Sequence, residues 1–373
     1  MSVPTTMRAV VPLHADHNAG GPVGVAYSDL GRFAALADLP VPTPGPGQVL
    51  VRVRRAAVNP SDLHYLAGEY GLPRRPDAAA GFEGTGEVVA CGPGWSLPAL
   101  YARRLVGRRV AFGVGPDGGG SWAEYALTDA AAAIPVGDAI RDEDAAALLV
   151  NPFTAWAMVD DAIRRHRPRA EMGAKGNVKG NVKGGTMPAI VLTAGASQLS
   201  RLALTLAKER ALPTIAVVRR EAQRAELLDA GASAVLVTTA EGFDAERDDA
   251  FARLRPLTLL DAVGDEVSSA LVGAMGRGAH WIVYGGLAAG VPPGLSPLDA
   301  IFRGKVMRGF WLSDWLGQAP IARRLACARE VRARFSDGRW STRVAASVPL
   351  ARVMDDLLPA PREGGKVQIA MAG

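Results

Sequence analysis

The fold of this chain is decided by the stretch Ala189-Ile190-Val191-Leu192-Thr193-Ala194-Gly195-Ala196-Ser197-Gln198-Leu199-Ser200-Arg201, in which an apolar run breaks into small residues and then opens a helical pattern. Four more apolar runs follow, at 214–218, 234–237, 258–260 and 280–284, and segments with helical periodicity separate them. This alternation predicts a doubly wound parallel sheet over about residues 189–286. Ligands bind such sheets outside the carboxyl ends of the strands, so we expect the first turn to meet phosphate groups.

That turn keeps only part of the Gly-x-Gly-x-x-Gly pattern of dinucleotide-binding sheets. Gly195 is present, but Leu199 stands where a later glycine is often found. Small residues still allow close backbone approach, and the first amides of the helix that opens near Ser197 can receive an anion. The candidate cofactor contacts are therefore Gly195, Ala196, Ser197, Gln198 and Leu199, with an ordinary tight turn as the alternative.

The second strand ends in Arg219 and Arg220, where NAD-binding sheets usually place an acidic residue on the ribose hydroxyls. An acid at this position would repel a 2′-phosphate. Arginine offers a planar fork of donors, and a charge-assisted hydrogen bond contributes roughly 1.5–3 kcal/mol. The sequence therefore favours NADPH over NADH, with Arg219 as the stronger candidate; the alternative is a pair of solvated arginines.

Length and composition indicate a two-domain, cytoplasmic protein. The chain has 373 residues, of which 49% are hydrophobic, enough to bury two cores. No run approaches the roughly 18 apolar residues of a membrane span, and the first residues do not resemble a signal peptide. Two cysteines, Cys91 and Cys327, cannot build a zinc site, and we expect both to be reduced and structural.

The positive charge does not indicate a nucleic-acid partner. The net charge is +5 and the isoelectric point is about 9.4, but the basic residues are spread over many helices. No helix-turn-helix, zinc finger or basic strip with interleaved aromatic residues is present. An anionic cofactor and substrate explain the charge more simply.

The first 150 residues have a β-rich pattern. Short strands are expected at 49–53, 86–90 and 109–112, and a further one at 121–125 after Gly118-Gly119-Gly120. We therefore expect an antiparallel, partly closed sheet. After Asp142 a helix is expected, which Pro152 should interrupt before it resumes over 153–163.

Beyond that helix, the sequence Gly176-Asn177-Val178-Lys179 repeats at once as Gly180-Asn181-Val182-Lys183. We expect a mobile loop there; docking of an acidic partner, such as an acyl carrier protein, is the functional interpretation, and a solvated insertion is the simpler one. A helix is expected over 321–335, and strands over 344–348 and 367–371 return the tail to the first domain.

The order of several motifs resembles the medium-chain dehydrogenase/reductase superfamily, and within it the zinc-free branch of quinone reductases and enoyl-thioester reductases. The motifs are Val58-Asn59-Pro60-Ser61-Asp62, Gly81-Phe82-Glu83-Gly84-Thr85-Gly86, Gly120-Ser121-Trp122-Ala123-Glu124-Tyr125, Asp261-Ala262-Val263-Gly264 and Gly364-Gly365-Lys366-Val367. The resemblance implies a Rossmann domain at 151–309, inserted into a partly closed GroES-like β-barrel domain formed by 1–150 and 310–373, with a cleft between the two.

The positions that carry zinc ligands in other members of that superfamily are Asn59, Phe82 and Asn151 here. Neither an amide nor a phenyl ring is a competent zinc ligand, so we expect no catalytic metal. Without a Lewis acid, oxidation of simple alcohols is disfavoured. Hydride transfer to an electron-poor acceptor, such as an enoyl thioester or a quinone, needs less assistance.

The candidate proton donor is Tyr70. The segment Gly68-Glu69-Tyr70-Gly71 resembles the one in which enoyl-thioester reductases carry a catalytic tyrosine, and a phenol with a pKa near 10 suits protonation of an enolate. Tyr65 and His64 lie close to the expected site as substitutes. The segment Gly309-Phe310-Trp311-Leu312-Ser313-Asp314-Trp315 resembles the part of these enzymes that borders cofactor and substrate.

The resemblance implies further contacts. To the cofactor it assigns Asn59, Thr154, Val263, Tyr284, Gly285, Gly286, Phe310, Trp311 and Lys366, and to the substrate Tyr65 and Trp315; a solvated lysine is the alternative for Lys366. We expect a zinc-independent NADPH-dependent reductase of an α,β-unsaturated carbonyl or enoyl thioester, with an NADPH:quinone oxidoreductase as the alternative. A nucleotide-binding module without turnover is a third interpretation. A small-molecule electrophile and a second copy in a homodimer are the expected partners.

Overall fold

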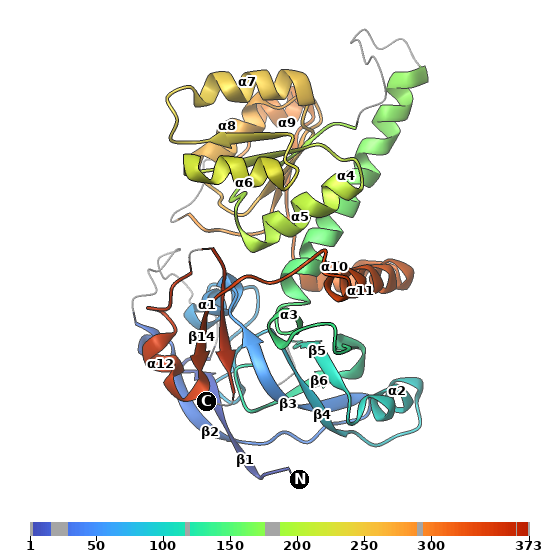
Figure 1. The fold of residues 1–373 in the computed structure, drawn as a ribbon, viewed down its shortest axis with the longest axis vertical. Helices are drawn as coiled ribbons and strands as arrows, with labels where there is room; N and C mark the ends of the chain where they lie inside the picture. Colours follow the sequence, from blue (N-terminus) through green and yellow to red (C-terminus); the bar gives the residue numbers. More distant parts are fainter. Residues whose placement is uncertain are drawn as a thin grey trace. The chain divides into compact units, whose positions relative to one another are not determined.

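The computed structural model describes residues 3–15, 29–115, 120–175, 187–288, 294–362 and 364–371. The chain divides into two compact units, one formed by Met1–Phe153 with Ile321–Gly373 and the other by Thr154–Pro320 (Figure 1). The sequence indicates boundaries at 150 and 310, so the second boundary lies further along the chain than expected.

The unit 154–320 contains a parallel sheet of six strands in the order β10-β9-β8-β11-β12-β13. The strands are β8 (Ile190–Leu192), β9 (Thr214–Val218), β10 (Ala234–Val237), β11 (Thr258–Asp261), β12 (His280–Val283) and β13 (Val306–Gly309). Strand order reverses between β8 and β11, which is where ligands bind in doubly wound sheets. Strand β13 is not expected from the sequence; its residues are all exposed, so no buried apolar run marks it.

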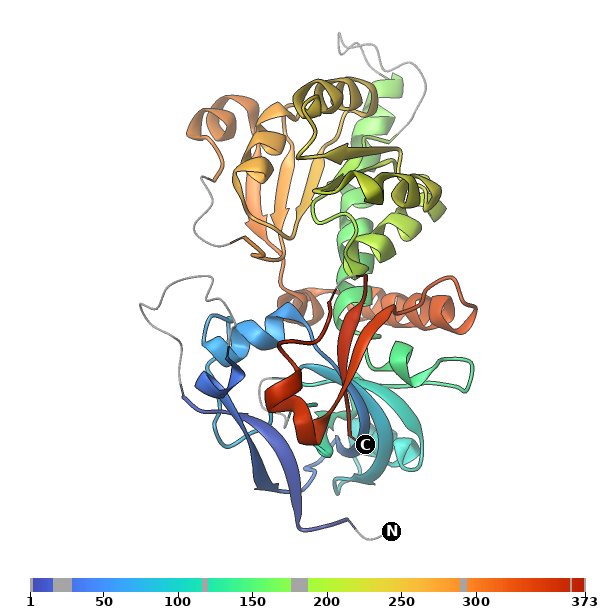
Figure 2. The same ribbon diagram turned by 60° about the vertical axis from the view of Figure 1, so that its left-hand side comes forward.

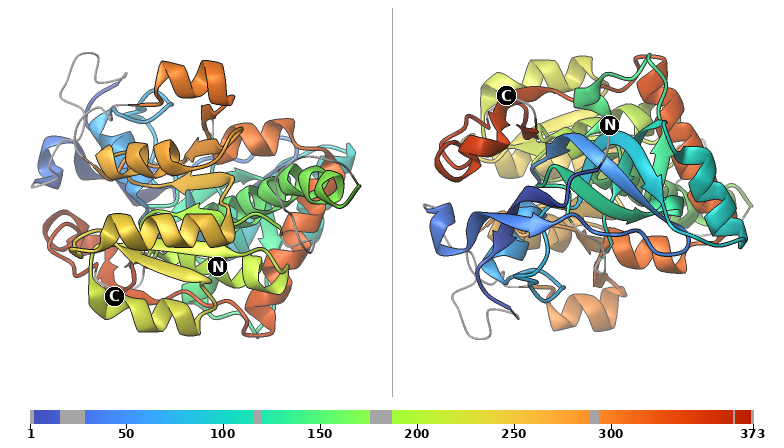
Figure 3. Two further views of the ribbon diagram at one scale, coloured as in Figure 1. Left: turned by 90° about the horizontal axis from the view of Figure 1, so that it is seen from above. Right: turned by 90° about the horizontal axis from the view of Figure 1, so that it is seen from below.

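Helices lie on both faces of this sheet (Figures 2 and 3). The helices of this unit are α4 (Val150–Lys175), α5 (Gln198–Glu209), α6 (Arg224–Asp229), α7 (Phe243–Leu254), α8 (Glu266–Ala274), α9 (Pro297–Arg303) and α10 (Leu312–Gln318), with a 3₁₀ turn η3 at Glu221–Gln223. The expected interruption is present, but it lies before Pro152: four residues separate the end of α3 (Asp142–Ala145) from the start of α4 at Val150. Proline is tolerated in the first turn of a helix, where its missing N–H has no partner to lose, and α4 begins only two residues earlier.

The other unit contains a mixed sheet in the order β14-β15-β3-β4-β5-β7, with β6 paired to β3, and a separate ribbon of β1 and β2. The strands are β1 (Thr6–Pro12), β2 (Ala34–Pro40), β3 (Gln48–Ala57), β4 (Glu83–Cys91), β5 (Arg109–Gly113), β6 (Tyr125–Asp129), β7 (Ala133–Pro135), β14 (Val344–Pro349) and β15 (Lys366–Ala370). The expected strand at 121–125 is wrong, since β6 starts only at Tyr125. The return of the tail is confirmed, because β15 pairs antiparallel with β3.

The helices of this unit are α1 (Pro60–Ala67), α2 (Leu97–Leu105), α3 (Asp142–Ala145), α11 (Ile321–Ser336) and α12 (Val353–Asp356), with 3₁₀ turns η1 (Leu30–Arg32), η2 (Ala130–Ala132) and η4 (Leu350–Arg352). Helix α1 has clear sequence signals at both ends. Asp62 accepts a hydrogen bond from the N–H of Asn59 at its start, and Gly68 takes the left-handed conformation at its end, with φ of 79°.

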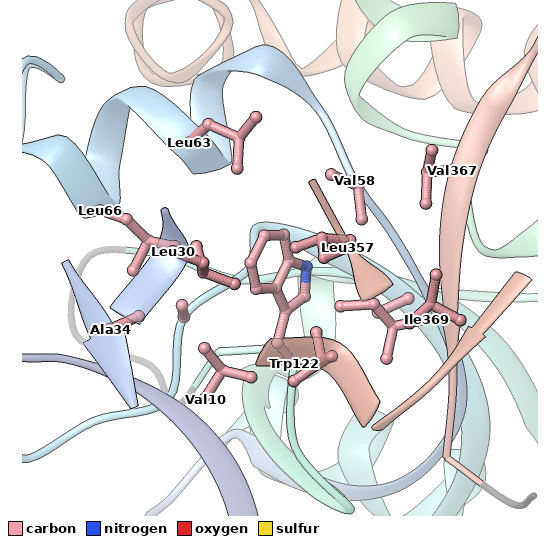
Figure 4. Close-up of a cluster of buried hydrophobic side chains, with 14 of the residues drawn as sticks. Val10, Leu30, Ala34, Val58, Leu63, Leu66, Trp122, Leu357, Val367 and Ile369 are labelled. Atoms are coloured by element: carbon pink, nitrogen blue, oxygen red, sulfur yellow. The ribbon is translucent and has the colours of Figure 1, made fainter. Parts of the chain in front are cut away.

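The core beneath α1 gathers segments from both ends of the chain around Trp122 (Figure 4). Trp122 is fully buried, and its indole N–H donates to the carbonyl of Ala57 at 3.0 Å. Val10, Leu66 and Ile369 pack in the same cluster. This core fixes the position of α1, which carries several of the candidate site residues.

The Gly-Asn-Val-Lys repeat at 176–183, where a mobile loop is expected, lies outside the described residues. Among the described residues, no helix combines the length and apolar character needed to cross a bilayer.

Candidate functional site

The turn between β8 and α5 is shaped by close packing against β9. Ala194 has a positive φ of 44°, and Ser197 caps α5 by accepting the N–H of Ser200 at 3.2 Å. The Gly195 N–H donates to the carbonyl of Val217 at 2.9 Å. A Cβ on Gly195 would lie 2.9 Å from the Ala216 side chain, so the one glycine retained from the pattern is required by contact with the neighbouring strand. Ala196 and Gln198 are half-buried and Leu199 is buried.

Arg219 and Arg220 follow β9 directly, and both side chains are exposed. The carbonyl of Arg219 accepts the hydroxyl of Thr239 at 2.8 Å, which fixes the backbone from which this side chain extends. Arg219 and Arg220 therefore lie at the carboxyl edge of the sheet, one strand away from the β8 turn. This edge is where the adenosine end of a dinucleotide binds in such folds.

Asp261, at the end of β11, organises this same edge, and sequence reasoning missed it as a site residue. It is fully buried, and one carboxylate oxygen accepts the hydroxyls of Thr193 at 2.7 Å and Ser268 at 2.9 Å. The other oxygen accepts the indole N–H of Trp281 at 2.8 Å, and the N–H groups of Val263 and Gly264 also donate to the carboxylate. One side chain thus connects β8, β11, α8 and β12. Its place at the end of a strand, before a small residue and a glycine, was the available signal.

The chain after β12 is tied to the end of β11. The N–H of Tyr284 donates to the Asp261 carbonyl at 2.9 Å, and burial raises the pKa of the Tyr284 phenol, which stays protonated. A Cβ on Gly285 would lie 2.9 Å from the carbonyl oxygen of Ala262, whereas nothing lies within 4 Å of one on Gly286. Gly285 therefore permits a close approach of two backbones, and Gly286 is exposed beside it.

The aromatic segment after β13 is partly buried. The N–H of Phe310 donates to the Val283 carbonyl at 2.8 Å, and Trp311 precedes α10. Trp315 packs edge-to-face on Trp156, with ring centroids 6.1 Å apart. Thr154 is buried near the start of the same unit.

In the other unit, a buried polar cluster joins Asn59, Asp62, Glu83 and Lys366. Asp62 accepts the N–H groups of Asn59 at 2.7 Å and Phe82 at 2.9 Å. Glu83 accepts the amide Nδ2 of Asn59 at 3.0 Å with one oxygen and the N–H groups of Leu149 and Val150 with the other. The ammonium of Lys366 donates to Oδ1 of Asn59. Both ends of the Asn59 carboxamide are thereby engaged.

Burial governs the titration of this cluster. It raises the pKa of Asp62 to about 7, against the opposing effects of its two N–H donors and of Lys366. Burial also lowers the pKa of Lys366, while Glu83 and Asp62 act in the opposite direction. The alternative of a solvated Lys366 is wrong, because its side chain is buried and directed at Asn59.

Two tyrosines pack on the ring of Phe82. The Tyr70 ring lies 4.9 Å from it between centroids, and the Tyr65 ring lies 5.5 Å away in an edge-to-face arrangement. A cavity of about 170 Å³ opens beside Tyr65 and Phe82, and Leu72, Arg75 and Val114 also line it. The Tyr65 hydroxyl accepts the N–H of Arg75 at 3.0 Å, and burial raises the pKa of its phenol. The Nδ1 atom of His64 lies 3.1 Å from the carboxylate Oε2 of Glu69.

The donor set at the three expected zinc positions does not suit a metal. Phe82 offers no donor atom, and the Asn59 amide is held between Glu83 and Lys366. Asn151 is half-buried in the first turn of α4. Within the described ranges, no group of three or more His, Cys, Asp or Glu residues could hold a metal ion.

Comparisons with known proteins agree with this architecture. The family described as alcohol dehydrogenase GroES-like domain matches residues 45–138. Mitochondrial enoyl-[acyl-carrier-protein] reductase of Bos taurus is 30% identical over 302 residues, covering 78% of this chain and 71% of that protein. Prostaglandin reductase-3 of Bos taurus is 30% identical over 291 residues, covering 75% and 68%. A solved structure from Mesorhizobium loti, described as a candidate NADPH:quinone reductase, is 40% identical with a TM-score of 0.85 and covers 99% of this chain and 100% of that one.

A doubly wound nucleotide-binding sheet is combined here with a GroES-like domain in which Phe82, a side chain without a donor atom, occupies one of the three expected zinc positions. This combination defines the class of zinc-independent reductases and dehydrogenases. The chain belongs to the medium-chain dehydrogenase/reductase superfamily, in its zinc-independent branch.

Proposed function

We propose that this chain is an NADPH-dependent reductase that transfers hydride to the activated double bond of an α,β-unsaturated carbonyl compound or enoyl thioester. The observation that carries the proposal is the pair of phenols packed on Phe82, in a unit where the expected zinc positions provide no ligand set. Several relatives are enoyl-[acyl-carrier-protein] reductases by name.

The residues at the carboxyl edge of the parallel sheet fit a phosphorylated dinucleotide. Gly195 to Leu199 would contact the pyrophosphate, because α5 begins there and presents its first amides and the positive end of its dipole. Arg219 and Arg220 would bind the 2′-phosphate with charged donors. Val263, Tyr284, Gly285, Gly286, Phe310 and Trp311 are proposed contacts further along this edge, and Thr154 is proposed beside the nicotinamide. When bound, NADPH supplies the hydride.

Tyr70 is the proposed proton donor, and Tyr65 is proposed to contact the substrate. Hydride addition to a conjugated carbonyl compound leaves an enolate that must be protonated at carbon, and a phenol that is neutral at pH 7 can provide this proton. The Tyr65 hydroxyl accepts the Arg75 N–H, so its own hydrogen points elsewhere and can be donated to a carbonyl oxygen. Trp315 is a further proposed substrate contact.

An NADPH:quinone oxidoreductase is the second candidate, and the 40% identical protein from Mesorhizobium loti favours it. A quinone needs no dedicated acid, since water can protonate the product. A screen of acceptors under NADPH, with crotonyl thioesters, enones and quinones, separates the two candidates. Tyr70→Phe should lower kcat for the thioester by at least tenfold and leave quinone reduction unchanged. Tyr101→Phe, at an exposed tyrosine on α2, is the matched control.

An unchanged rate of thioester reduction in Tyr70→Phe would refute the assignment of the acid. Turnover of quinones alone would favour the second candidate. Binding of NADPH without oxidation by any acceptor would refute both, and would favour a nucleotide-binding module.

A homodimer through the edge of the parallel sheet is proposed as well. β13 is the last strand of this sheet, and all four of its residues are exposed, including Val306 and Met307. An exposed apolar edge strand favours pairing with another strand. Met307→Lys should shift the chain to a monomer in analytical ultracentrifugation, whereas Leu97→Lys on α2 should not.

The cytoplasmic localisation stays a prediction, and several relatives are mitochondrial by name.

A further inference from the structure

The buried ammonium of Lys366 has an unusual set of neighbours. Its side chain is 7% exposed, while Asn59 is 1% exposed and Asp62 and Glu83 are fully buried. Lysine is almost never buried without a partner, since removing its charge from water is costly. Here the ammonium donates to Oδ1 of Asn59. The nearby carboxyl groups of Glu83 and Asp62 oppose the lowering of the Lys366 pKa by burial.

The hydrogen bonds of this cluster connect three segments that are distant in sequence. Asn59 precedes α1, Glu83 begins β4 and Lys366 begins β15. The carboxamide of Asn59 joins the other two, because its Nδ2 donates to Glu83 at 3.0 Å and its oxygen accepts from Lys366. The orientation of this amide is therefore fixed by a charge on each side.

The cluster also holds the backbone of Phe82. Asp62 accepts the N–H of Phe82 at 2.9 Å, and the next residue along the chain is Glu83. The rings of Tyr65 and Tyr70 pack on Phe82. A change in the charge balance of the cluster would thus reach the two phenols through one residue.

We propose that Lys366 is a positioning residue of the reductase site: it serves as the internal counter-ion of Asp62 and Glu83, and it fixes Asn59 and Phe82 beneath the two tyrosines. The proposal rests on the proposed function for its effect on turnover. It differs from the role in cofactor binding that the family resemblance implies, because a lysine that binds a phosphate must direct its ammonium toward the nucleotide.

A double-mutant cycle between Lys366 and Glu83 tests the counter-ion in the absence of cofactor and substrate. Lys366→Met should lower the melting temperature, because two carboxyl groups lose their counter-ion. Glu83→Gln should also lower the melting temperature, because the introduced NH₂ would face another donor in either orientation. That donor is the Nδ2 of Asn59 in one orientation and the N–H groups of Leu149 and Val150 in the other. In the double variant Asn59 can turn its oxygen toward that introduced NH₂, so part of the loss should be recovered.

Lys305 provides the matched control. Its ammonium is also buried, but it donates to the carbonyls of Val272 and Gly273 and to Asp299 in the other unit. Lys305→Met should lower the melting temperature too, and Glu83→Gln should add to that loss without recovery. Recovery specific to Lys366→Met supports the proposal. Losses that add for both lysines would overturn it.

Kinetics of Lys366→Met test the positioning role. Misplacement of the tyrosines should lower kcat by roughly tenfold to a hundredfold, while the Kd for NADPH in nicotinamide fluorescence stays within about twofold of the wild-type value. A Kd raised tenfold or more with kcat unchanged would overturn the proposal and favour contact with the cofactor phosphates. If the wild-type chain reduces no acceptor, the proposed function fails, whereas the thermal cycle and the NADPH titration still decide the counter-ion assignment.

Discussion

Asp261→Asn is expected to destabilise the unit 154–320 strongly. The substitution keeps the shape of the side chain but removes its charge and turns one acceptor oxygen into a donor. The new NH₂ must take the place of one of the two carboxylate oxygens. One of them accepts the indole N–H of Trp281, and the other accepts the hydroxyls of Thr193 and Ser268 and the N–H of Val263. The two hydroxyls can rotate to accept it, whereas the indole cannot, so the side chain should turn its NH₂ toward the hydroxyls and leave the Val263 N–H unpaired.

The magnitude follows from the number of contacts that change. Hydrogen bonds to a charged group contribute about 1.5–3 kcal/mol each, so losing two of them costs about 3–6 kcal/mol. For a unit of this size, 1 kcal/mol corresponds to about 2–4 °C. The expected drop in melting temperature is therefore about 6–24 °C, measured by circular dichroism on the full chain.

Two further variants make the test specific. Asp248→Asn, at an exposed ion pair on α7, should change the melting temperature by no more than about 2 °C, since surface pairs contribute little. Trp281→Phe removes only the indole donor, and its loss should not add fully to that of Asp261→Asn, because both variants remove the same contact. A melting temperature for Asp261→Asn close to that of the wild-type chain, or full additivity with Trp281→Phe, would refute the reasoning.

Three other predictions follow from the same geometry. Arg219→Gln should raise the Kd for NADPH about tenfold to a hundredfold and change the Kd for NADH little, with exposed Arg253→Gln as control; equal losses for both cofactors in a fluorescence titration would contradict a 2′-phosphate contact. Because the pKa of Asp62 is raised to about 7 in the folded chain, the folded state holds a proton that the unfolded state releases, so stability falls as pH rises from about 4 to 7. The melting temperature of Asp62→Asn should therefore rise relative to that of the wild-type chain as the pH increases from about 4 to 7. A difference between the two melting temperatures that does not change with pH would argue against the raised pKa. Gly285→Ala places a Cβ 2.9 Å from a carbonyl oxygen and should cost about 1–3 kcal/mol in urea unfolding, whereas Gly286→Ala, with open space around it, should be nearly neutral; equal effects would refute the close approach.

The parallel sheet could be predicted from sequence because its strands are short apolar runs buried on both faces. β8, β9 and β10 carry almost no polar residue and are nearly all buried, so their continuous apolar runs were enough to locate them. β13 has the opposite character, since its residues are all exposed and it pairs only at the edge of the sheet. Its pairing depends on β12, which no local pattern reveals.

The candidate site was predicted unevenly for a similar reason. The turn at 195–199 and the arginines after β9 were predicted from local sequence, and both lie at the carboxyl edge of the sheet because parallel strands end on the same side. Asp62 and Glu83 were noticed only as members of motifs, although the spacing of Asn59 and Asp62 was a capping signal. Their partner Lys366 lies 307 residues from Asn59, and such a pairing can be read only from the fold.

The distance in sequence between Lys366 and its partners has a consequence for synthesis of the protein. When the ribosome has made the first 153 residues and the whole of the inserted unit, α1 and β4 have no counter-ion for their two carboxyl groups, and β3 still lacks the neighbour β15. The inserted unit can fold during this interval, since its strands pair only with one another. The mixed sheet must wait for β15, so a chain that stops before Lys366 would have an intact parallel sheet and a mixed sheet without the strand between β14 and β3.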